Sequence, residues 1–278
     1  QPDLLRRLLP DEDARPASWT KHDLDVARTF ALGLERLRPD DGTDADARLM
    51  LAAATCLIHG EPFPRALLTG ILPGDDPRPA GRAVNRLLAL GLLERSGAET
   101  LRLHRLPARF AAGALAEGMD TARAAVEEAV IDLAYEQNMA GDPRRLRAWE
   151  SHLRHVVDAA FDREDETAAT LCANLGFYLK MIGDLAGARP YYERALAIIE
   201  RVLGPDHPQT AGSLNNLGSL LQAMGDLAGA RPYYEQALAI RERVLGSEHP
   251  DTATSLNNLG GLLQDMGDLT GARPYLER

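Results

Sequence analysis

The residue types that most often perform chemistry are few in this sequence, and their spacing matches no catalytic or metal-binding motif. Only Lys21 and Lys180 are lysines, and neither follows a glycine as in the phosphate-binding loop G-x-x-x-x-G-K-[ST]. Cys56 and Cys172 stand far apart in apolar segments, as expected of reduced thiols used as small hydrophobes. No G-x-S-x-G or H-E-x-x-H motif occurs. We therefore expect no enzyme activity, no catalytic residue, no metal and no cofactor in this chain.

The histidines are candidate metal ligands, because zinc accepts pairs of them at helical spacing. His152 and His155 would share one face of a helix, but the sequence around them offers few further ligands. His207 and His249 recur in loops, one to each repeated unit. We interpret all four as structural or solvated residues.

Composition points to a helical, globular chain. The 278 residues contain 45% hydrophobic and 26% charged residues, only 5% aromatics, and many Ala, Leu and Arg residues, which favour helices. The net charge of −10 does not favour nucleic-acid binding by the chain as a whole. Because no apolar run of membrane-spanning length and no signal-peptide core is present, we expect a cytoplasmic protein without a membrane partner.

The C-terminal part is repetitive. Residues 169–210, 211–252 and 253–278 align without a gap at a period of 42. The first two units are identical at about two thirds of positions, and the last two at about three quarters of their overlap. Such a period indicates a repeat architecture in which each unit buries its apolar face against its neighbours.

Each unit has the pattern of a helical hairpin. Leu214, Leu217 and Leu221 recur at three- and four-residue spacing and predict one apolar stripe on a first helix. Gly225 can end this helix with a positive φ, and Asp226 can cap the second helix. Prolines at 190, 232 and 274 fall inside the second helices, where we expect a slight kink.

These hairpins resemble the tetratricopeptide repeat (TPR), and the 42-residue length and the HPxT loop are similar to its kinesin-light-chain type. The resemblance implies a right-handed α-superhelix over residues 168–278, with the last repeat truncated and its open helix face available for end-to-end self-association. The matching positions are Leu217, Gly218, Leu221, Ala230, Tyr234 and Ala237.

An array of this kind binds a protein or peptide ligand, and the first helices carry polar residues opposite their apolar stripes. The ladder of Asn174, Asn216 and Asn258 resembles the groove asparagines of peptide-binding TPRs, since an amide can donate to and accept from a peptide backbone. In the alternative interpretation the same asparagines bond the neighbouring helix and hold the stack. The complete set of candidate groove residues is Asn174, Asn215, Asn216, Ser219, Gln222, Asn257, Asn258 and Gln264.

Residues 23–112 have a different organisation, in which several helices precede a hairpin with strands LLER and LRLH and the turn SGAET. Helices followed by one small hairpin predict a winged-helix domain. Its fourth helix offers only Arg82, Asn85 and Arg86 to a partner, so we regard nucleic acid as an improbable ligand. Residues 1–22 are interpreted as a linker or the remnant of a preceding domain. Residues 113–167 are interpreted as a helical linker, a cap-like hairpin in which Trp149 is the anchor.

A winged helix that leads into TPRs, with the junction LRLHRLPARFA, looks like the C-terminal part of a bacterial STAND NTPase of the NB-ARC class. In that family a Met-His-Asp motif stands at this junction, and its histidine senses the bound nucleotide. His104 matches that position, whereas Arg105 replaces the family's Asp. The resemblance implies a preceding nucleotide-binding domain, and ATP or ADP only in the intact parent. The alternative for His104 is a satisfied histidine at a strand end.

Three functions follow as hypotheses. In the first, the chain is the regulatory half of such an NTPase: a ligand in the TPR groove acts through the winged helix on the absent nucleotide domain. In the second it is a stand-alone TPR adaptor, and in the third a DNA-binding regulator. Because the sequence starts at Gln1 and stops at Arg278 within a repeat, we expect it to be an excerpt of a longer protein.

Overall fold

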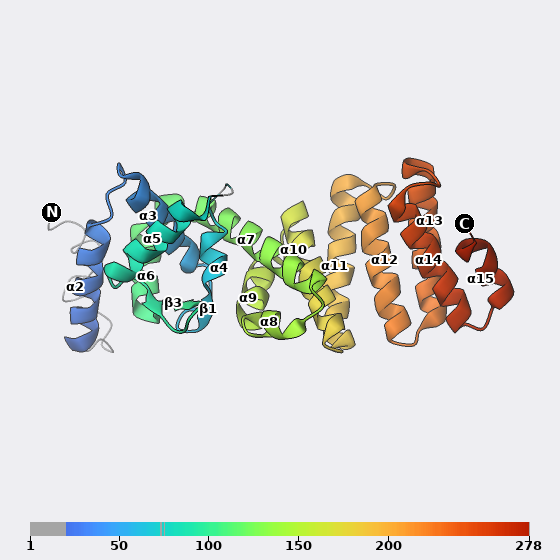
Figure 1. The fold of residues 1–278 in the computed structure, drawn as a ribbon, viewed down its shortest axis with the longest axis horizontal. Helices are drawn as coiled ribbons and strands as arrows, with labels where there is room; N and C mark the ends of the chain where they lie inside the picture. Colours follow the sequence, from blue (N-terminus) through green and yellow to red (C-terminus); the bar gives the residue numbers. More distant parts are fainter. Residues whose placement is uncertain (1–20, 73, 75, 278) are drawn as a thin grey trace. The chain divides into compact units, whose positions relative to one another are not determined.

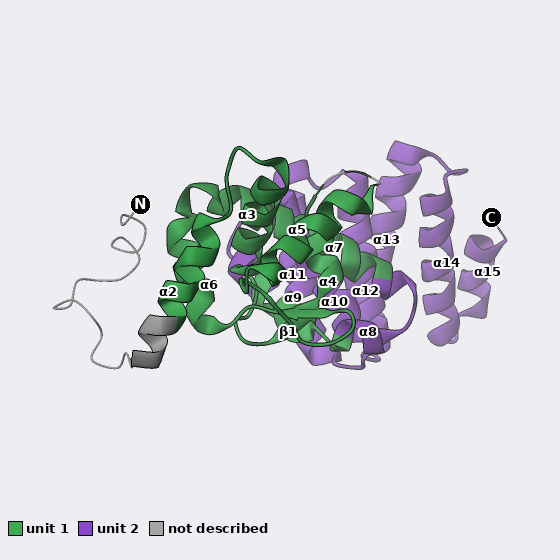
Figure 2. Cartoon of the chain, turned by 60° about the vertical axis from the view of Figure 1, so that its left-hand side comes forward, with its two compact units in different colours: residues 1–136, 147–156 green, residues 137–146, 157–278 purple. Residues whose placement is uncertain are grey.

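The computed structural model describes residues 21–277 except 73 and 75 (Figure 1). The chain is mostly helical, as predicted. It forms two compact units, which Figure 2 distinguishes by colour: unit 1 consists of residues 1–136 and 147–156, and unit 2 of residues 137–146 and 157–278. Nearly all of the segment interpreted as an N-terminal linker, residues 1–22, lies outside the described residues.

Unit 1 begins with helices and short strands in alternation. Asp41 caps α3 by accepting a hydrogen bond from the backbone N–H of Asp44, and Asp76 caps α5 in the same way. The elements in chain order are α2 (Lys21–Glu35), α3 (Gly42–Ala54), β1 (Pro62–Pro64), α4 (Arg65–Thr69), α5 (Pro77–Ala89), β2 (Glu94–Arg95), β3 (Thr100–Arg102) and α6 (Arg105–Ala114).

The strands form one antiparallel sheet in the order β1-β3-β2. The predicted hairpin is confirmed as β2 and β3. The sequence did not predict β1, because Pro62 and Pro64 argue against a strand. Both prolines are accommodated because β1 is an edge strand, and between them the buried side chain of Phe63 stands opposite Leu101 of β3.

A 3₁₀ turn (Ala116–Gly118) connects α6 to α7 (Met119–Met139), which is followed by α8 (Pro143–Arg147) and α9 (Glu150–Ala160). Helices α7 and α9 each contribute residues to both units. Trp149 is buried within unit 1. Within unit 2, the Nδ2 of Asn138 donates to the backbone carbonyl of Asn174 at 3.1 Å, so the end of α7 contacts the first repeat.

Unit 2 contains the repeated hairpins, and the predicted first and second helices of each repeat are confirmed. Figure 1 shows them following one another along the C-terminal part of the chain. The first helices are α10 (Glu166–Met181), α12 (Pro208–Ala223) and α14 (Pro250–Asp265), and the second helices are α11 (Leu185–Leu203), α13 (Leu227–Leu245) and α15 (Leu269–Leu276).

The turn within each hairpin follows the predicted chemistry. Gly225 has φ +82°, and the side chain of Asp226 then accepts from the N–H of Gly229 at 2.9 Å. The same arrangement recurs at 183–187 and 267–271. Pro232 lies inside α13, as expected from its place in the repeat.

The two helices of a hairpin approach closely where the first helix carries a glycine. A Cβ built on Gly218 would lie 3.0 Å from Cε1 of the buried Tyr234, and one on Gly176 equally close to Tyr192. The Leu-Gly pair of the repeat therefore provides the space that the second-helix tyrosine fills.

Candidate protein-binding surface

The first helices of unit 2 present a row of partly or fully exposed residues on the side opposite their buried stripes. Because α10 contacts α12, and α12 contacts α14, the three rows are neighbours. We call this region the first-helix surface. It comprises Asn174, Lys180, Gly212, Asn216, Ser219, Gln222, Asn257, Asn258, Gly261, Gln264 and Asp265.

Asn174, Asn216 and Asn258 occupy the same position of consecutive repeats, and all three are half-buried. Within the described residues their side-chain amides form no hydrogen bond, and only the backbone carbonyl of Asn174 accepts one. Each amide therefore keeps two donor hydrogens and an acceptor oxygen for a partner. Their role in ligand binding stays a prediction.

Asn215 lies in a different environment from the other residues predicted to line the groove. The residue is only 7% exposed, and its Nδ2 donates to the Ser255 hydroxyl at 2.9 Å, from α12 to α14. For this residue the geometry favours the alternative of a contact that holds neighbouring repeats together. Asn257, its counterpart one repeat later, is exposed.

Hydrogen bonds between repeats hold other members of the surface in place. The Lys180 ammonium donates to Ser219, and Nε2 of Gln222 donates to the Asp265 carboxylate at 2.6 Å. Within the second repeat, the Tyr234 hydroxyl donates to Oε1 of Gln222 at 2.9 Å. Ser219 and Gln222 are thus joined to neighbouring repeats, while Gln264 is exposed.

Lys180 was not among the predicted site residues. It stands where later repeats have Gln222 and Gln264, and this change from amide to cation is the signal that the sequence contained. Burial lowers the pKa of the Lys180 ammonium.

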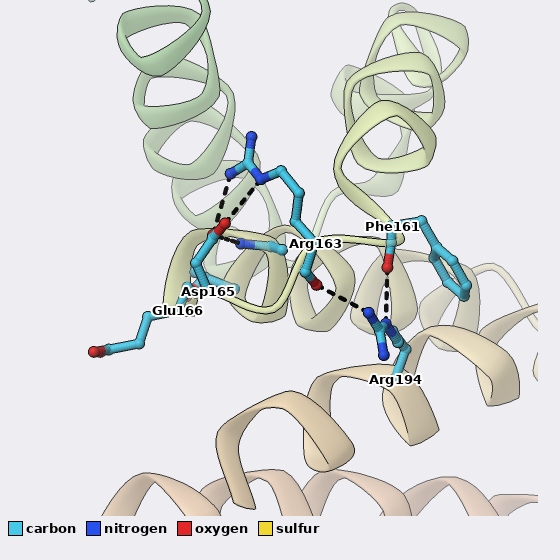
Figure 3. Close-up of polar contacts among 7 residues, drawn as sticks. Phe161, Arg163, Asp165, Glu166 and Arg194 are labelled. Atoms are coloured by element: carbon cyan, nitrogen blue, oxygen red, sulfur yellow. Dashed lines mark hydrogen bonds and ion pairs between the residues drawn. The ribbon is translucent and has the colours of Figure 1, made fainter. Parts of the chain in front are cut away.

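The beginning of the repeats is fixed by two arginines (Figure 3). Arg194 of α11 donates from Nε to the carbonyl of Phe161 at 2.8 Å and from Nη2 to the carbonyl of Arg163 at 2.9 Å. Arg163 in turn holds Asp165, whose carboxylate caps α10 through the N–H of Ala168. The hydrogen bond from Arg163 is the main cause that lowers the pKa of Asp165.

The repeat histidines take the same capping position. Nδ1 of His207 accepts from the N–H of Gln209 at 3.2 Å, and Nδ1 of His249 accepts from the N–H of Asp251 at 3.1 Å. Among the described residues no group of three or more His, Cys, Asp and Glu side chains is arranged to hold a metal ion.

His104 lies at the junction between β3 and α6 in unit 1. It is exposed, and its Nε2 pairs with the Glu94 carboxylate on the hairpin. Arg105, which stands where the resembled motif has Asp, is exposed as well. The nucleotide-sensing role of His104 stays a prediction.

The outward face of α5 carries Arg82 and Asn85, both exposed. Arg86, the third residue proposed to reach a partner from this helix, is occupied within unit 1. Its Nε donates to Asp44 at 2.8 Å and its Nη2 to the carbonyl of Arg36 at 3.1 Å. The hydrogen bond from Arg86 is also the main cause that lowers the pKa of Asp44.

Comparison with known proteins identifies the repeats. The tetratricopeptide repeat family matches over residues 166–239 and 209–278, so this part of the chain consists of TPRs, as the resemblance implied. No curated protein matches. Among the described residues, no helix combines the length and apolar character needed to cross a bilayer.

Two solved structures illustrate what parts of this chain are similar to. The nearly identical TPR-like repeats of a kinesin light chain from Podosopora anserina are 27% identical, with a TM-score of 0.48, over 54% of this chain and 71% of that one. BtubC (BKLC) from P. vanneervenii is 22% identical, with a TM-score of 0.51, over 73% of this chain and 80% of that one. The second match shows a shared fold.

Proposed function

We propose that residues 166–278 are a protein-interaction scaffold that binds an extended segment of a partner along the first-helix surface. The observation that supports this most directly is the row of Asn174, Asn216 and Asn258 amides, half-buried and without intramolecular hydrogen bonds in the described residues. A half-buried polar group without a partner is costly unless water or a ligand satisfies it. An extended peptide backbone offers N–H and C=O groups at regular intervals, which suits such a ladder.

A peptide selection tests this proposal. Binding peptides are selected from a random phage-displayed library, and the dissociation constant of the best one is measured by fluorescence anisotropy. Replacing Asn174, Asn216 and Asn258 together by Ala should weaken binding at least about tenfold, since each net hydrogen bond contributes ~0.5–1.5 kcal/mol. Gln236→Ala, an exposed amide on the second helix α13, is the matched control and should leave binding unchanged. A library that yields no binder, or a triple variant that binds as the wild type does, refutes the proposal.

We further propose that, in a longer protein with a preceding nucleotide-binding domain, unit 1 relays partner binding to that domain. Two features support this: unit 1 runs helix, helix, strand, helix, helix, hairpin, the order of a winged helix, and the exposed His104 stands directly after the hairpin. A ligand can shift such a switch only if it binds one state more tightly than the other. The stand-alone adaptor is equally consistent with the TPR match.

Nucleotide release separates these two functions. The parent reading frame is expressed with the residues that precede Gln1, and release of a fluorescent ADP analogue is followed with and without the selected peptide. The relay proposal expects the peptide to change the release rate and His104→Ala to change it as well. A rate that responds to neither supports the adaptor.

A further inference from the structure

Arg241 has an unusual environment for an arginine of this chain. It belongs to the second helix α13, yet its guanidinium extends to the first helix α14, where Nη1 donates to the carbonyl of Asp251 at 2.8 Å and to the Ser255 hydroxyl at 3.0 Å. The residue is only 8% exposed, and Nε is buried without a hydrogen-bond partner. The intramolecular contacts therefore satisfy the guanidinium only in part.

No carboxylate of the described residues lies within ion-pairing distance of Arg241, although the Asp251 carboxylate acts on it at longer range. Other arginines of the second helices do have such partners: Arg231 pairs with Glu235 at 2.6 Å, and Arg243, two residues further along α13, pairs with Asp206. A buried cation without a counter-ion is costly, whereas an apolar side chain of similar volume is often neutral or stabilising. The stacking of the repeats therefore does not by itself account for an arginine here.

Gly212 of the first-helix surface lies next to this guanidinium, and we call the space at this glycine the opening. Position 212 lies in the partly exposed row of α12 together with Asn216 and Ser219, and it is a glycine. A Cβ built on Gly212 would lie 4.0 Å from Nη2 of Arg241 and would meet no other atom within 4 Å. The end of the Arg241 side chain thus stands behind a part of the surface that carries no side chain.

The first repeat lacks this arrangement. At the positions of Gly212 and Arg241 it has Thr170 and Ile199. The third repeat has Thr254 at the position of Gly212. The opening and the cation behind it therefore occur together in the second repeat, although the repeats are otherwise built alike.

We propose that Arg241, reached through the opening at Gly212, is an anion-recognition point of the first-helix surface, and that the bound partner places an Asp or Glu side chain there. This inference rests on the proposed function, because it names the chemistry of the peptide that the surface binds. Nη2 forms no hydrogen bond within the described residues, so both of its N–H groups are available. A carboxylate on them gains a charge-assisted hydrogen bond in surroundings of low dielectric constant.

The charges of the surface complement an acidic segment. Lys180 is a second cation without a carboxylate partner in the described residues. It lies on the neighbouring helix α10 and donates to Ser219 of α12. On the other side, the Asp265 carboxylate is engaged by Gln222. We expect a partner whose acidic residue stands over α12, with a further acid favoured toward α10.

The test uses an array of random peptides probed with the full chain. Peptides bound by the wild type should be enriched in Asp and Glu. For the best of them, Arg241→Ile, which copies Ile199 of the first repeat, should weaken binding at least about tenfold, as expected for one charge-assisted hydrogen bond. Arg243→Ile removes an exposed cation from the same helix and should change binding less than about twofold.

Two further variants separate recognition from folding. Gly212→Thr, which copies the first and third repeats, should cover the guanidinium and weaken binding without removing any charge. A Glu→Gln change in the peptide should weaken binding to the wild type but not weaken it further in Arg241→Ile. If Arg241→Ile does not fold, Gly212→Thr and the Glu→Gln peptide decide the question by themselves.

Several results overturn the inference. Bound peptides without acidic enrichment, or acidic enrichment that persists in both Arg241→Ile and Gly212→Thr, remove Arg241 as the recognition point. Preference for a phosphoserine peptide over its Glu counterpart shows that phosphate, and not carboxylate, is the group recognised. An array on which no peptide binds refutes the proposed function itself, which is a separate outcome.

Discussion

Lowering the pH from about 7.5 to about 5 is expected to destabilise unit 1 through His152. This side chain is fully buried. Its Nδ1 accepts from the backbone N–H of Ile58 at 3.1 Å, and its Nε2 faces the carbonyl of Pro62 at 3.0 Å. The ring must therefore be neutral, with its proton on Nε2, because a proton on Nδ1 would face another donor. His152 thereby joins α9 to the segment that leads into β1.

Burial lowers the pKa of His152, and this effect outweighs the carbonyl of Pro62 and the charge of Glu61, which both act to raise it. His155, the other titratable group near the ring, acts in the same direction as burial. In the unfolded chain a histidine titrates near pH ~6.5. Below that pH the unfolded state binds a proton that the folded state excludes, so the free energy of unfolding falls by up to ~1.4 kcal/mol per pH unit. Between pH ~6.5 and ~5 the loss reaches up to ~2 kcal/mol, and above pH ~6.5 it vanishes.

Urea unfolding measured at several pH values in a Trp19→Phe background provides the assay. The fluorescence of Trp149 is the signal, because this residue is buried in unit 1 close to His152. The wild type should lose stability progressively below pH ~6.5. His152→Gln can still donate and accept but does not titrate, so it should be less stable at neutral pH and much less sensitive to acid. The reasoning is wrong if the variant keeps the full pH dependence of the wild type, or if the wild type shows none in this range.

Calorimetry and urea titration test the remaining predictions, which concern the stability of unit 2. Gly218→Ala should destabilise it by ~1–3 kcal/mol because the new Cβ would lie 3.0 Å from the buried Tyr234 ring. Gly261→Ala should stabilise α14 by up to ~1 kcal/mol, because a Cβ at this position meets nothing within 4 Å. Equal shifts of the two melting temperatures would contradict the packing argument. His207→Asp should stabilise the chain by ~0.5–1 kcal/mol, because Asp165 caps the first repeat at the same position and aspartate is the stronger cap. A lower urea midpoint for His207→Asp would show that the histidine does more than cap.

Local chemistry made most of the fold predictable. The helical hairpins were predictable because their end signals are local: a glycine ends each first helix, and an aspartate caps each second helix. The 42-residue period showed that the same hairpin recurs. Strand β1 could not be, because its pairing with β3 depends on residues distant in sequence, and Pro62 and Pro64 argue locally against a strand. The division of α7 and α9 between the two units has the same cause: it depends on tertiary contacts that helical periodicity does not report.

The candidate site was predictable to a smaller extent. Helical periodicity correctly placed Asn216, Asn258 and Gln264 away from the apolar stripe. It failed for Asn215, which lies at the edge of the stripe and is covered by the neighbouring repeat through Ser255. From the sequence alone, Arg241 does not differ from the other arginines of the second helices. Its burial depends on space between repeats, which no pattern within a single helix describes.

The differences between the first two repeats are concentrated in the first helix of the hairpin. The first and second repeats differ at 14 of 42 positions, of which nine fall in residues 170–182, the first helix, and only two in the second helix. Some of the nine differing positions are buried, such as Cys172 with Leu214 and Tyr178 with Leu220. Others change the first-helix surface, such as Thr170 with Gly212 and Lys180 with Gln222. The two second-helix differences are Arg194 with Gln236, and Ile199 with Arg241. Arg194 holds the loop before the first repeat, and Arg241 extends to the first-helix surface, so the second substitution also changes the surface that we propose binds the partner.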